Sequence, residues 1–338
     1  MILDGNAPSS IAAAARALRS GRLVGLPTET VYGLAANAAS DTAVAQIFAA
    51  KGRPSDHPLI VHVADASGMA HFASEVPAFA QKLVDAFWPG PLTLILPRRP
   101  GVANGATGGQ NSVGLRCPAH PVAHALLMAC AAPADGSTPG DTTVWGLAAP
   151  SANRFGRVSP TTAGHVQEEL GPELLVLDGG PCDVGIESTI VDCTRGQPVL
   201  LRPGSITREQ IEQACGLALL SREDLPTHTP RASGTLEAHY APHAKVRLMD
   251  AKALQTGLDL LGAGAANIAV YARTVVHTRS AGVVLRRMPD DAAATAQQLF
   301  AALRSFDEQG VKLIWVETPP ATPAWEGVRD RLQRAAAA

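Results

Sequence analysis

Residues 26–34 read Leu26-Pro27-Thr28-Glu29-Thr30-Val31-Tyr32-Gly33-Leu34, and they place two threonines, a carboxylate and a phenol directly after an expected strand at 23–26. In open α/β sheets, ligands bind outside the ends of the strands. If the strand belongs to such a sheet, this stretch is where a small polar ligand would be held. A turn without a ligand is the alternative that this stretch alone leaves open.

The expected elements around this stretch are irregularly spaced. Ser9 or Ser10 is expected to cap a helix over 11–18, and Asp41 a second helix that ends near Lys51-Gly52. Residues 59–63 (LIVHV) form a strand by their β-branched content, with His62 on the face of Ile60. Further strands are expected at 92–96, 113–116, 144–149, 174–177, 188–192 and 199–202, and helices at 76–87, 121–130, 161–170 and 207–215. Many strands with fewer helices favour a twisted α/β sheet that is not regularly doubly wound.

The length of 338 residues favours two domains. Segment 221–238 lacks apolar periodicity and contains Pro226, Pro230 and Gly234, so it marks the boundary. Beyond it, strands are expected at 245–249, 268–271, 282–285 and 311–316, and helices at 251–261, at 292–306 and from 324. This order predicts a small Rossmann-like α/β domain. No G-x-G-x-x-G follows its first strand, so no dinucleotide is expected there.

Composition limits the class of protein. With 28 basic and 30 acidic residues, the formal net charge of -2 argues against a strongly basic nucleic-acid binder. The five cysteines have no C-x-x-C spacing, and reduced, buried thiols are expected. The pairs His120/His124 and His239/His243 show i,i+4 spacing without an evident third ligand, so no metal site is predicted. The N-terminus has no signal-peptide pattern, and a cytoplasmic protein is expected.

Two groups of residues suit a polyphosphate. In Lys51-Gly52-Arg53 the glycine lets both cations approach one anion, although a solvated helix end is the alternative. Residues 150–160 (PSANRFGRVSP) place hydroxyl and amide groups in a loop before a helix, whose N-terminal amides favour anions. Together they suggest a nucleotide site without a P-loop.

Other polar groups are expected at strand ends. Arg116 ends a strand beside Ser112, where it suits a carboxylate or, alternatively, a surface ion pair. Residues 178–192 are glycine-rich and then turn into a strand headed by Glu187-Ser188-Thr189, and Arg202 ends a further strand. No G-x-S-x-G elbow or Ser/His/Asp set is evident, so hydrolysis is weakly supported.

Four motifs occur in one order: Pro27 to Leu34, Lys51-Gly52-Arg53-Pro54, Ser151-Ala152-Asn153 and Glu187 to Asp192. In these the chain resembles the YrdC-like L-threonylcarbamoyladenylate synthases. His239-Tyr240-Ala241-Pro242 resembles the linker motif of their long, two-domain form. The resemblance implies a YrdC-like catalytic domain at 1–206 with a twisted open mixed sheet, a linker with a lid motif at 207–243, and a C-terminal Rossmann-like domain at 244–338.

The resemblance also implies an activity. That family condenses L-threonine, bicarbonate or CO2, and ATP into threonylcarbamoyl-AMP and pyrophosphate. This is the first step towards threonylcarbamoyl-adenosine at position 37 of ANN-decoding tRNAs, and a downstream threonylcarbamoyl transferase complex receives the product. Magnesium is expected on the ATP phosphates and needs no dedicated protein cage.

Residue roles follow from the resemblance. L-Threonine would be held by Thr30, His62, Arg116, Ala149 and Ser188, with Arg116 pairing its carboxylate and Ala149 offering only backbone. ATP would be surrounded by Lys51, Arg53, His57, Ser112, Ser151, Asn153, Ser159 and Arg202, and Tyr240 would fold the linker over the nucleotide as a lid. Lys51, Arg53, Ser151 and Asn153 are the residues assigned to catalysis.

Some positions depart from the family pattern. His57 stands where many members have Asn, residues 131–143 look like an insertion, and Ser233-Gly234 stands where Pro-Gly is common. Two other functions are considered. One is carbamoyl transfer in hydrogenase maturation, against which the lack of acylphosphatase-like and zinc-finger segments counts. The other is a non-catalytic module that binds double-stranded RNA or tRNA.

Overall fold

The computed structural model describes residues 1–133, 143–221, 224, 231–232, 234 and 238–338. It divides into two compact units. The first comprises Met1–Phe155, Pro160–Asp183 and Glu187–Thr235, and the second Gly156–Ser159, Val184–Ile186 and Leu236–Ala338. Most of the expected insertion at 131–143, and Ser233 of the linker, lie outside the described residues.

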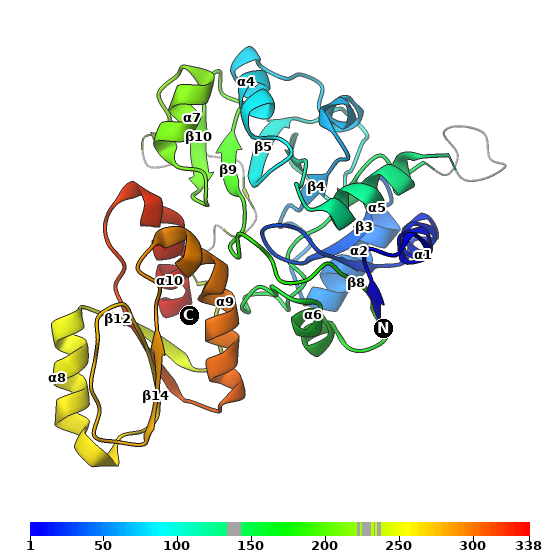
Figure 1. The fold of residues 1–338 in the computed structure, drawn as a ribbon. Coiled ribbons are helices and arrows are strands. Elements are labelled where there is room, and N and C mark those ends of the chain that lie inside the picture. Colours follow the sequence, from blue (N-terminus) through cyan, green and yellow to red (C-terminus); the bar gives the residue numbers. More distant parts are fainter. Residues whose placement is uncertain (134–142, 222–223, 225–230, 233, 235–237) are drawn as a thin grey trace. The chain divides into compact units, whose positions relative to one another are not determined.

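In the part of the chain that the structure describes, a mixed sheet of eleven strands forms the first unit (Figure 1). In spatial order its strands are β1 (Ile2–Asp4), β8 (Leu175–Asp178), β2 (Val24–Leu26), β3 (Gly33–Asn37), β7 (Leu147–Ala148), β4 (Ile60–His62), β6 (Ser112–Arg116), β5 (Leu92–Pro97), β9 (Thr189–Asp192), β10 (Val199–Arg202) and β11 (Leu220–Ser221). Parallel and antiparallel pairs are mixed along the sheet, as at β4 with β6 and β6 with β5. The predicted fold class, a twisted mixed sheet that is not regularly doubly wound, is confirmed.

The helices of this unit lie at α1 (Pro8–Arg19), α2 (Asp41–Lys51), α3 (Met69–Phe72), α4 (Ala78–Phe87), α5 (Pro121–Ala131), α6 (Ala163–Leu170) and α7 (Arg208–Cys215). Two expected caps were wrong. Ser9 and Ser10 lie inside α1, because Pro8 takes the first turn, where its fixed φ suits a helix start. Ser40 caps α2 by accepting from the Ala43 amide, and Asp41 takes the first helical position. Strands β1, β3 and β11 were not expected, and β7 is shorter than predicted.

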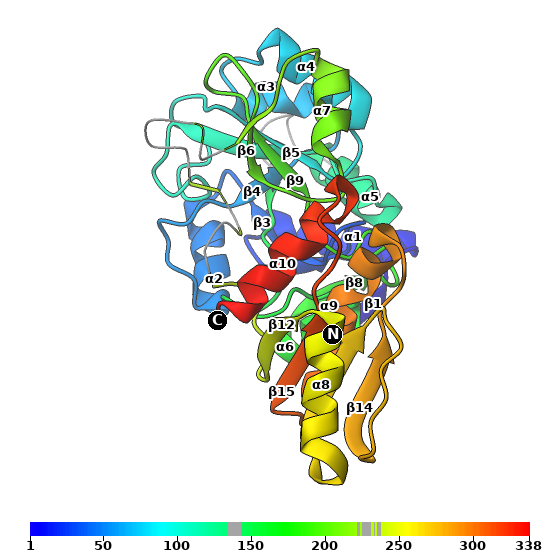
Figure 2. The ribbon, with the colours of Figure 1, turned by 90° about the vertical axis from the view of Figure 1, so that its left-hand side faces the viewer.

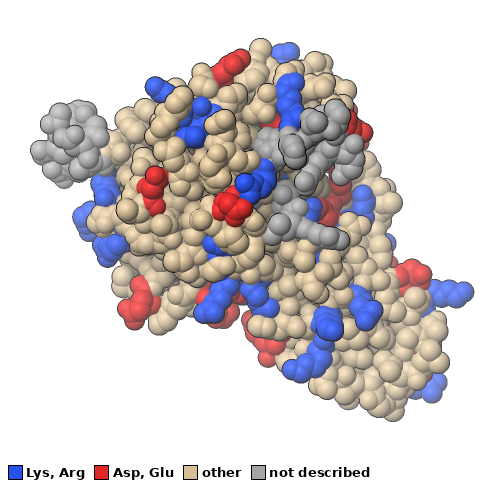
Figure 3. Space-filling view, turned by 180° about the vertical axis from the view of Figure 1, so that it is seen from behind, with Lys and Arg blue, Asp and Glu red and all other residues tan. Residues whose placement is uncertain are grey.

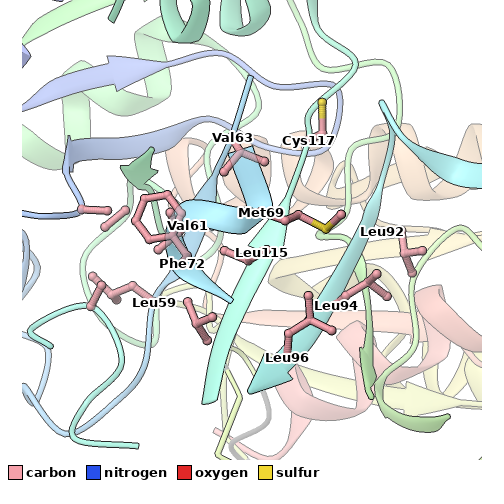
Figure 4. Packing of buried hydrophobic residues seen from close by; sticks show 14 of the residues in the cluster. Leu59, Val61, Val63, Met69, Phe72, Leu92, Leu94, Leu96, Leu115 and Cys117 are labelled. Carbon is pink, nitrogen blue, oxygen red and sulfur yellow. The ribbon is translucent and has the colours of Figure 1, made fainter. Parts of the chain in front are cut away.

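Strand alternation separates the two faces of the sheet at its centre. Leu59, Val61 and Val63 belong to the main apolar core with Leu92, Leu94, Leu96 and Leu115, and Figure 4 shows them packed with Met69 and Phe72. Ile60 belongs to a different cluster, with Ile95, Ile190, Val199 and Leu201. His62 therefore shares the face of Ile60, as the sequence predicts, and this second face carries the candidate site.

Among its described residues, the second unit has four parallel strands in the order β12 (Lys245–Met249), β15 (Leu313–Glu317), β13 (Ala266–Ala272) and β14 (Gly282–Arg287). Helix α8 (Ala251–Leu261) covers one face, and α9 (Ala292–Glu308) and α10 (Glu326–Ala336) cover the other (Figures 1 and 2). This is the predicted Rossmann-like arrangement. The closing helix starts later than expected, because a 3-10 turn at Pro323–Trp325 precedes it.

All five cysteines are buried and free of disulfides, as the sequence predicts. None of the helices in the described ranges has the length and apolarity that crossing a bilayer requires.

Candidate functional site

The sheet topology gathers polar residues at one edge. Strands β4, β6 and β10 end at this edge, whereas β5 and β9 begin there, because β5 runs antiparallel to β6 and β10 antiparallel to β9. His62 and Arg116 are direct register partners in the parallel pair of β4 and β6. The residues that meet at this edge are His62, Thr93, Arg116, Ser188 and Arg202.

Arg116 is buried and bonded on three sides. Its Nη2 lies 2.7 Å from Glu29 Oε1, and the two side chains are 4% and 9% exposed. Its Nη1 donates to Thr30 Oγ1 at 2.8 Å and its Nε to the Gly90 carbonyl at 3.3 Å. The surface ion pair that the sequence left open is thus excluded: the pair is internal, and it ties the 26–34 motif to the end of β6.

His62 is a neutral base inside the protein. Burial, and then the positive charge of Arg116, lower its pKa from 6.5 to about 3. The imidazole therefore stays uncharged at neutral pH. In this uncharged form one ring nitrogen can donate a hydrogen bond and the other can accept one.

Ser188 and Arg202 form the next part of this edge. The Ser188 hydroxyl lies 2.8 Å from Thr93 Oγ1. Arg202, 2% exposed, donates from Nε and Nη2 to the Ser188 carbonyl and from Nη2 to its hydroxyl at 3.2 Å. The guanidinium of Arg202 thus fixes the start of β9.

Lys51 ends α2 and points inward. Gly52 follows it in the left-handed conformation with φ 61°, which ends the helix as predicted. The ammonium is 3% exposed and donates to the carbonyls of Ser151, at 2.6 Å, and Asn153. Burial, reinforced by the charge of Arg53, holds the pKa of Lys51 well below 10.5. The solvated helix end is therefore excluded.

The 150–153 loop lies beside the 26–34 motif. The Leu34 amide donates to the Pro150 carbonyl and the Ala152 amide to the Tyr32 carbonyl, each at 2.8 Å. The Phe155 amide donates to the Lys51 carbonyl, also at 2.8 Å. Ala149 is buried, and its amide donates to Ile60. Three of the four sequence motifs are therefore hydrogen-bonded to one another.

Arg53 and His57 both contact the ring of Phe155. The Arg53 guanidinium carbon lies 5.8 Å and the His57 ring centroid 5.4 Å from the Phe155 centroid. Arg53 also donates to the Pro58 carbonyl at 2.9 Å. Partial burial, and then Arg53, lower the pKa of His57.

Ser112 is not beside Arg116, which corrects the sequence-based expectation. It starts β6, pairs with Pro97 and lies at the opposite end of the strand. It lines a small pocket with Gly114 and the apolar Ile60, Ile95 and Ile190, and with the polar Gln110 and Arg231. Between Ser112 and Arg116, the face of the sheet that carries Ile60 is therefore apolar. Ile95 packs closely over Gly114 there, since a Cβ added to Gly114 would lie 3.2 Å from the Ile95 side chain. This face combines a polar edge with an apolar floor.

Two of the expected ATP residues belong to the second unit. Ser159 is fully buried there, and its carbonyl accepts from Arg304. Tyr240 is also fully buried, with φ 61°; its ring lies 5.4 Å from that of Phe300 and 5.2 Å from the Arg331 guanidinium. The role of Tyr240 as a lid stays a prediction.

Sequence reasoning assigned no specific role to Glu29, Thr93 or Phe155, although Glu29 belongs to the 26–34 motif that it singled out. A signal was present for Thr93, which is the one polar residue in the apolar run at 92–96. The pairing of Glu29 with Arg116 and the contact of Phe155 with Arg53 had no such signal, because the partners are distant in sequence. The i,i+4 pair at His120 has a structural explanation: the His120 ring caps α5 by accepting from the Val122 amide.

A mixed sheet with buried cations, hydroxyl groups and a neutral imidazole at one edge defines an α/β protein that binds small charged ligands. Residues 16–204 match the Sua5/YciO/YrdC family model, described as telomere recombination. Residues 206–337 match the model described as threonylcarbamoyl-AMP synthase, C-terminal domain. The chain belongs to the Sua5/YciO/YrdC family, in its two-domain form.

Relatives of known name match over nearly the full length. The threonylcarbamoyl-AMP synthase of Bacillus subtilis is 38% identical, over 96% of this chain and 92% of the relative. That of Pyrococcus abyssi is 37% identical, over 95% and 92%. The solved structure of P. abyssi Sua5 complexed with L-threonine has a TM-score of 0.84 at 36% identity, covering 96% of this chain and 94% of that one. A P. abyssi Sua5 variant with an adjacent His and Tyr replaced by Ala has a TM-score of 0.87 at 34% identity, covering 99% and 96%.

Proposed function

We propose that this chain is an L-threonylcarbamoyladenylate synthase, a nucleotidyltransferase that condenses L-threonine, bicarbonate or CO2, and ATP. The observation that carries the proposal is the single edge where Arg116, Thr30, His62, Ser188 and Arg202 meet. Two relatives that this chain matches over more than nine tenths of its length are named threonylcarbamoyl-AMP synthase, and one solved relative holds L-threonine.

The reaction requires positioning more than covalent chemistry. The threonine amine adds to CO2 and releases a proton, or adds to bicarbonate and releases water, and becomes a carbamate. A carbamate oxygen then attacks the α-phosphorus of ATP in line, the bond to the bridging oxygen breaks, and pyrophosphate leaves. Such transfer depends on alignment and on neutralisation of phosphate charge. Buried cations fixed by hydrogen bonds serve both purposes.

The threonine end of the site is assigned to Arg116 and its neighbours. A guanidinium has five N–H donors; Thr30 and Gly90 accept hydrogen bonds from Arg116, and Glu29 forms an ion pair with it. The remaining donors are assigned to the substrate carboxylate, which then lies beside a cation already neutralised in part by Glu29. The neutral His62 and the Ser188 hydroxyl supply hydrogen bonds without adding charge, and Ala149 supplies backbone.

The ATP end is assigned to Lys51, Arg53 and Arg202. An ammonium has three donors, and Lys51 gives two of them to the carbonyls of Ser151 and Asn153. A phosphate oxygen would take the third. His57, Ser112 and Ser159 complete the assigned ATP contacts, and Tyr240 is assigned to the lid.

Magnesium is proposed to arrive with ATP as part of the substrate. The donor set of the ATP end consists of cations, hydroxyls and carbonyls, which fits a metal held mainly by phosphate oxygens and water. The protein then supplies the opposite charges around the same phosphates.

The proposed product serves tRNA modification at position 37 and passes to a threonylcarbamoyl transferase complex. Direct binding of double-stranded RNA is less well supported by the charges. Lys51, Arg53, Arg116 and Arg202 are at most 8% exposed, so they suit a small enclosed ligand rather than a duplex backbone. On the face in Figure 3, basic and acidic side chains are interspersed over a mainly uncharged surface. The match of 206–337 to the synthase C-terminal domain favours this activity over carbamoyl transfer in hydrogenase maturation.

The test is a condensation assay with the full chain. Purified protein with Mg-ATP, bicarbonate and L-threonine is expected to release pyrophosphate and to convert labelled bicarbonate into an adenylate that chromatography separates from ATP. Omission of threonine is expected to stop both. Lys51→Met should abolish them, whereas Arg287→Ala, at an exposed arginine paired with Asp290, should not. Pyrophosphate release independent of threonine would refute the proposal.

A further inference from the structure

Helix α9 of the second unit contacts a short segment from much earlier in the chain. Arg304, 8% exposed, donates from Nη2 to the Val158 carbonyl and from Nε to the Ser159 carbonyl at 3.4 Å. Asp307, one turn further along α9, lies 3.4 Å from Arg157 Nη2. Helix α9 thus fixes both the backbone and one side chain of Gly156–Ser159.

The same carboxylate orients the start of the Rossmann-like domain. Asp307 accepts from the amides of His243, at 2.7 Å, and Ala244, at 3.0 Å. The Ala241 amide donates to the Gly156 carbonyl at 2.8 Å. The segment after Tyr240 and Gly156–Ser159 are therefore held by one acidic group and one backbone bond.

A second segment lies against the first half of α9. Gly185 has φ 77°, and a Cβ at this position would lie 2.5 Å from the Ala296 carbonyl oxygen and 2.6 Å from that of Gln297. Val184–Ile186 therefore contacts α9 at a distance that only glycine allows. The limiting atoms belong to helix backbone, which cannot move aside as a flexible side chain would.

Both segments are continuous with residues assigned to ligands. Gly156–Ser159 follows Ser151 and Asn153 and contains Ser159, whereas Val184–Ile186 directly precedes Glu187-Ser188. We propose that α9 positions two loops of the active site. Arg304 sets the geometry of residues 151–159, which are assigned to ATP, and the contact of Gly185 with α9 sets the geometry of residues 184–188, which are assigned to threonine. This inference rests on the proposed function, and it gives the C-terminal domain a task without assigning it a ligand of its own.

The physical argument is one of preorganisation. Gly156–Ser159 has no regular secondary structure, so without external bonds its backbone would sample several conformations. The buried Arg304 guanidinium, which donates to two successive carbonyls of this segment, selects one of these conformations. Displacement of a reacting group by about 1 Å, even from a remote change, costs roughly 100-fold in rate. Arg304 and Gly185 therefore act as positioning residues, not catalytic ones.

Matched variants test the proposal in the full chain. Arg304→Ala is compared with Arg287→Ala, which removes an arginine that is 55% exposed in the same unit. Gly185→Ala is compared with Gly310→Ala, which shares a positive φ, 70°, but has no atom within 4 Å of the added Cβ. Arg304→Lys keeps the charge and one possible donor to Val158. Circular dichroism verifies that each variant is folded at the assay temperature.

We expect Arg304→Ala to raise the KM for ATP roughly 10- to 100-fold with a much smaller change in the KM for threonine, and Arg304→Lys to recover part of the loss. Gly185→Ala is expected to show the opposite split, and both controls should match the wild type. Hydrogen exchange supplies a readout that does not need activity: amides at 156–159 should lose protection in Arg304→Ala, and those at 184–188 in Gly185→Ala.

The outcomes separate the two proposals. A wild type without threonine-dependent pyrophosphate release refutes the proposed function alone, and hydrogen exchange then still decides whether α9 orders the two segments. An active wild type whose Arg304 and Gly185 variants equal their controls, in KM and in protection, overturns the inference alone. Should Arg304→Ala fail to fold, Arg304→Lys decides the question by the same two measurements.

Discussion

The ion pair of Glu29 and Arg116 allows a quantitative test by a double-mutant cycle. Arg116→Met leaves the Glu29 carboxylate, 9% exposed, without the guanidinium that lies 2.7 Å away. Breaking a buried pair in this way costs about 3–5 kcal/mol. Glu29→Gln leaves Arg116 with its bonds to Thr30 and Gly90, and we expect a loss of about 1.5–3 kcal/mol.

The double variant carries no unpaired buried charge, so its destabilisation should fall short of the sum of the single losses. We expect a coupling energy of about 2 kcal/mol, within the range for contacting residues. Urea unfolding followed by circular dichroism, with linear extrapolation, measures the free energies. The exposed pair of Asp56 and Arg231, changed to Asn and Met, serves as control and should show no resolvable coupling. Additivity at Glu29 and Arg116 within about 0.5 kcal/mol would refute the reasoning.

Three further predictions concern the site. The pKa of His62 is about 3 in the folded protein and 6.5 in the reference state, so the unfolded chain takes up the proton first as the pH falls. Stability should therefore drop by about 2 kcal/mol between roughly pH 7 and 5, and urea unfolding of His62→Gln should lack this part of the loss. The pKa of Lys51 is lowered by burial, and a bound triphosphate favours its charged form, so ATP binding should take up protons as the pH is raised into the range where Lys51 of the free protein loses its proton. Calorimetry in buffers of different ionisation enthalpy detects the uptake, and the same uptake in Lys51→Met would contradict the assignment. Gly52→Ala should cost about 1 kcal/mol in urea unfolding through backbone strain alone, since φ is 61° and no atom lies within 4 Å of the added Cβ; an unchanged midpoint would contradict this.

Local sequence chemistry was sufficient where the signal is local. Helix α2 ends at Lys51 because the next residue is Gly52, and glycine adopts the left-handed conformation without the strain that other residue types incur. The face of His62 follows from strand alternation with Ile60. The element boundaries that failed, at Ser9, Asp41 and β7, are those where neighbouring residues offer competing caps or short pairings.

The sequence by itself determined a mixed α/β sheet, a second Rossmann-like domain and four motifs rich in cations and hydroxyls, because periodicity, turn residues and residue chemistry are encoded over short distances. Only the tertiary structure decided that Glu29 pairs with Arg116, that Ser112 lies at the far end of β6, and that α9 holds Gly156–Ser159 and Val184–Ile186. The physical reason is that these contacts join residues that are separated by 15 to more than 140 positions in the sequence. Their geometry arises from strand order and register, which short-range patterns do not specify.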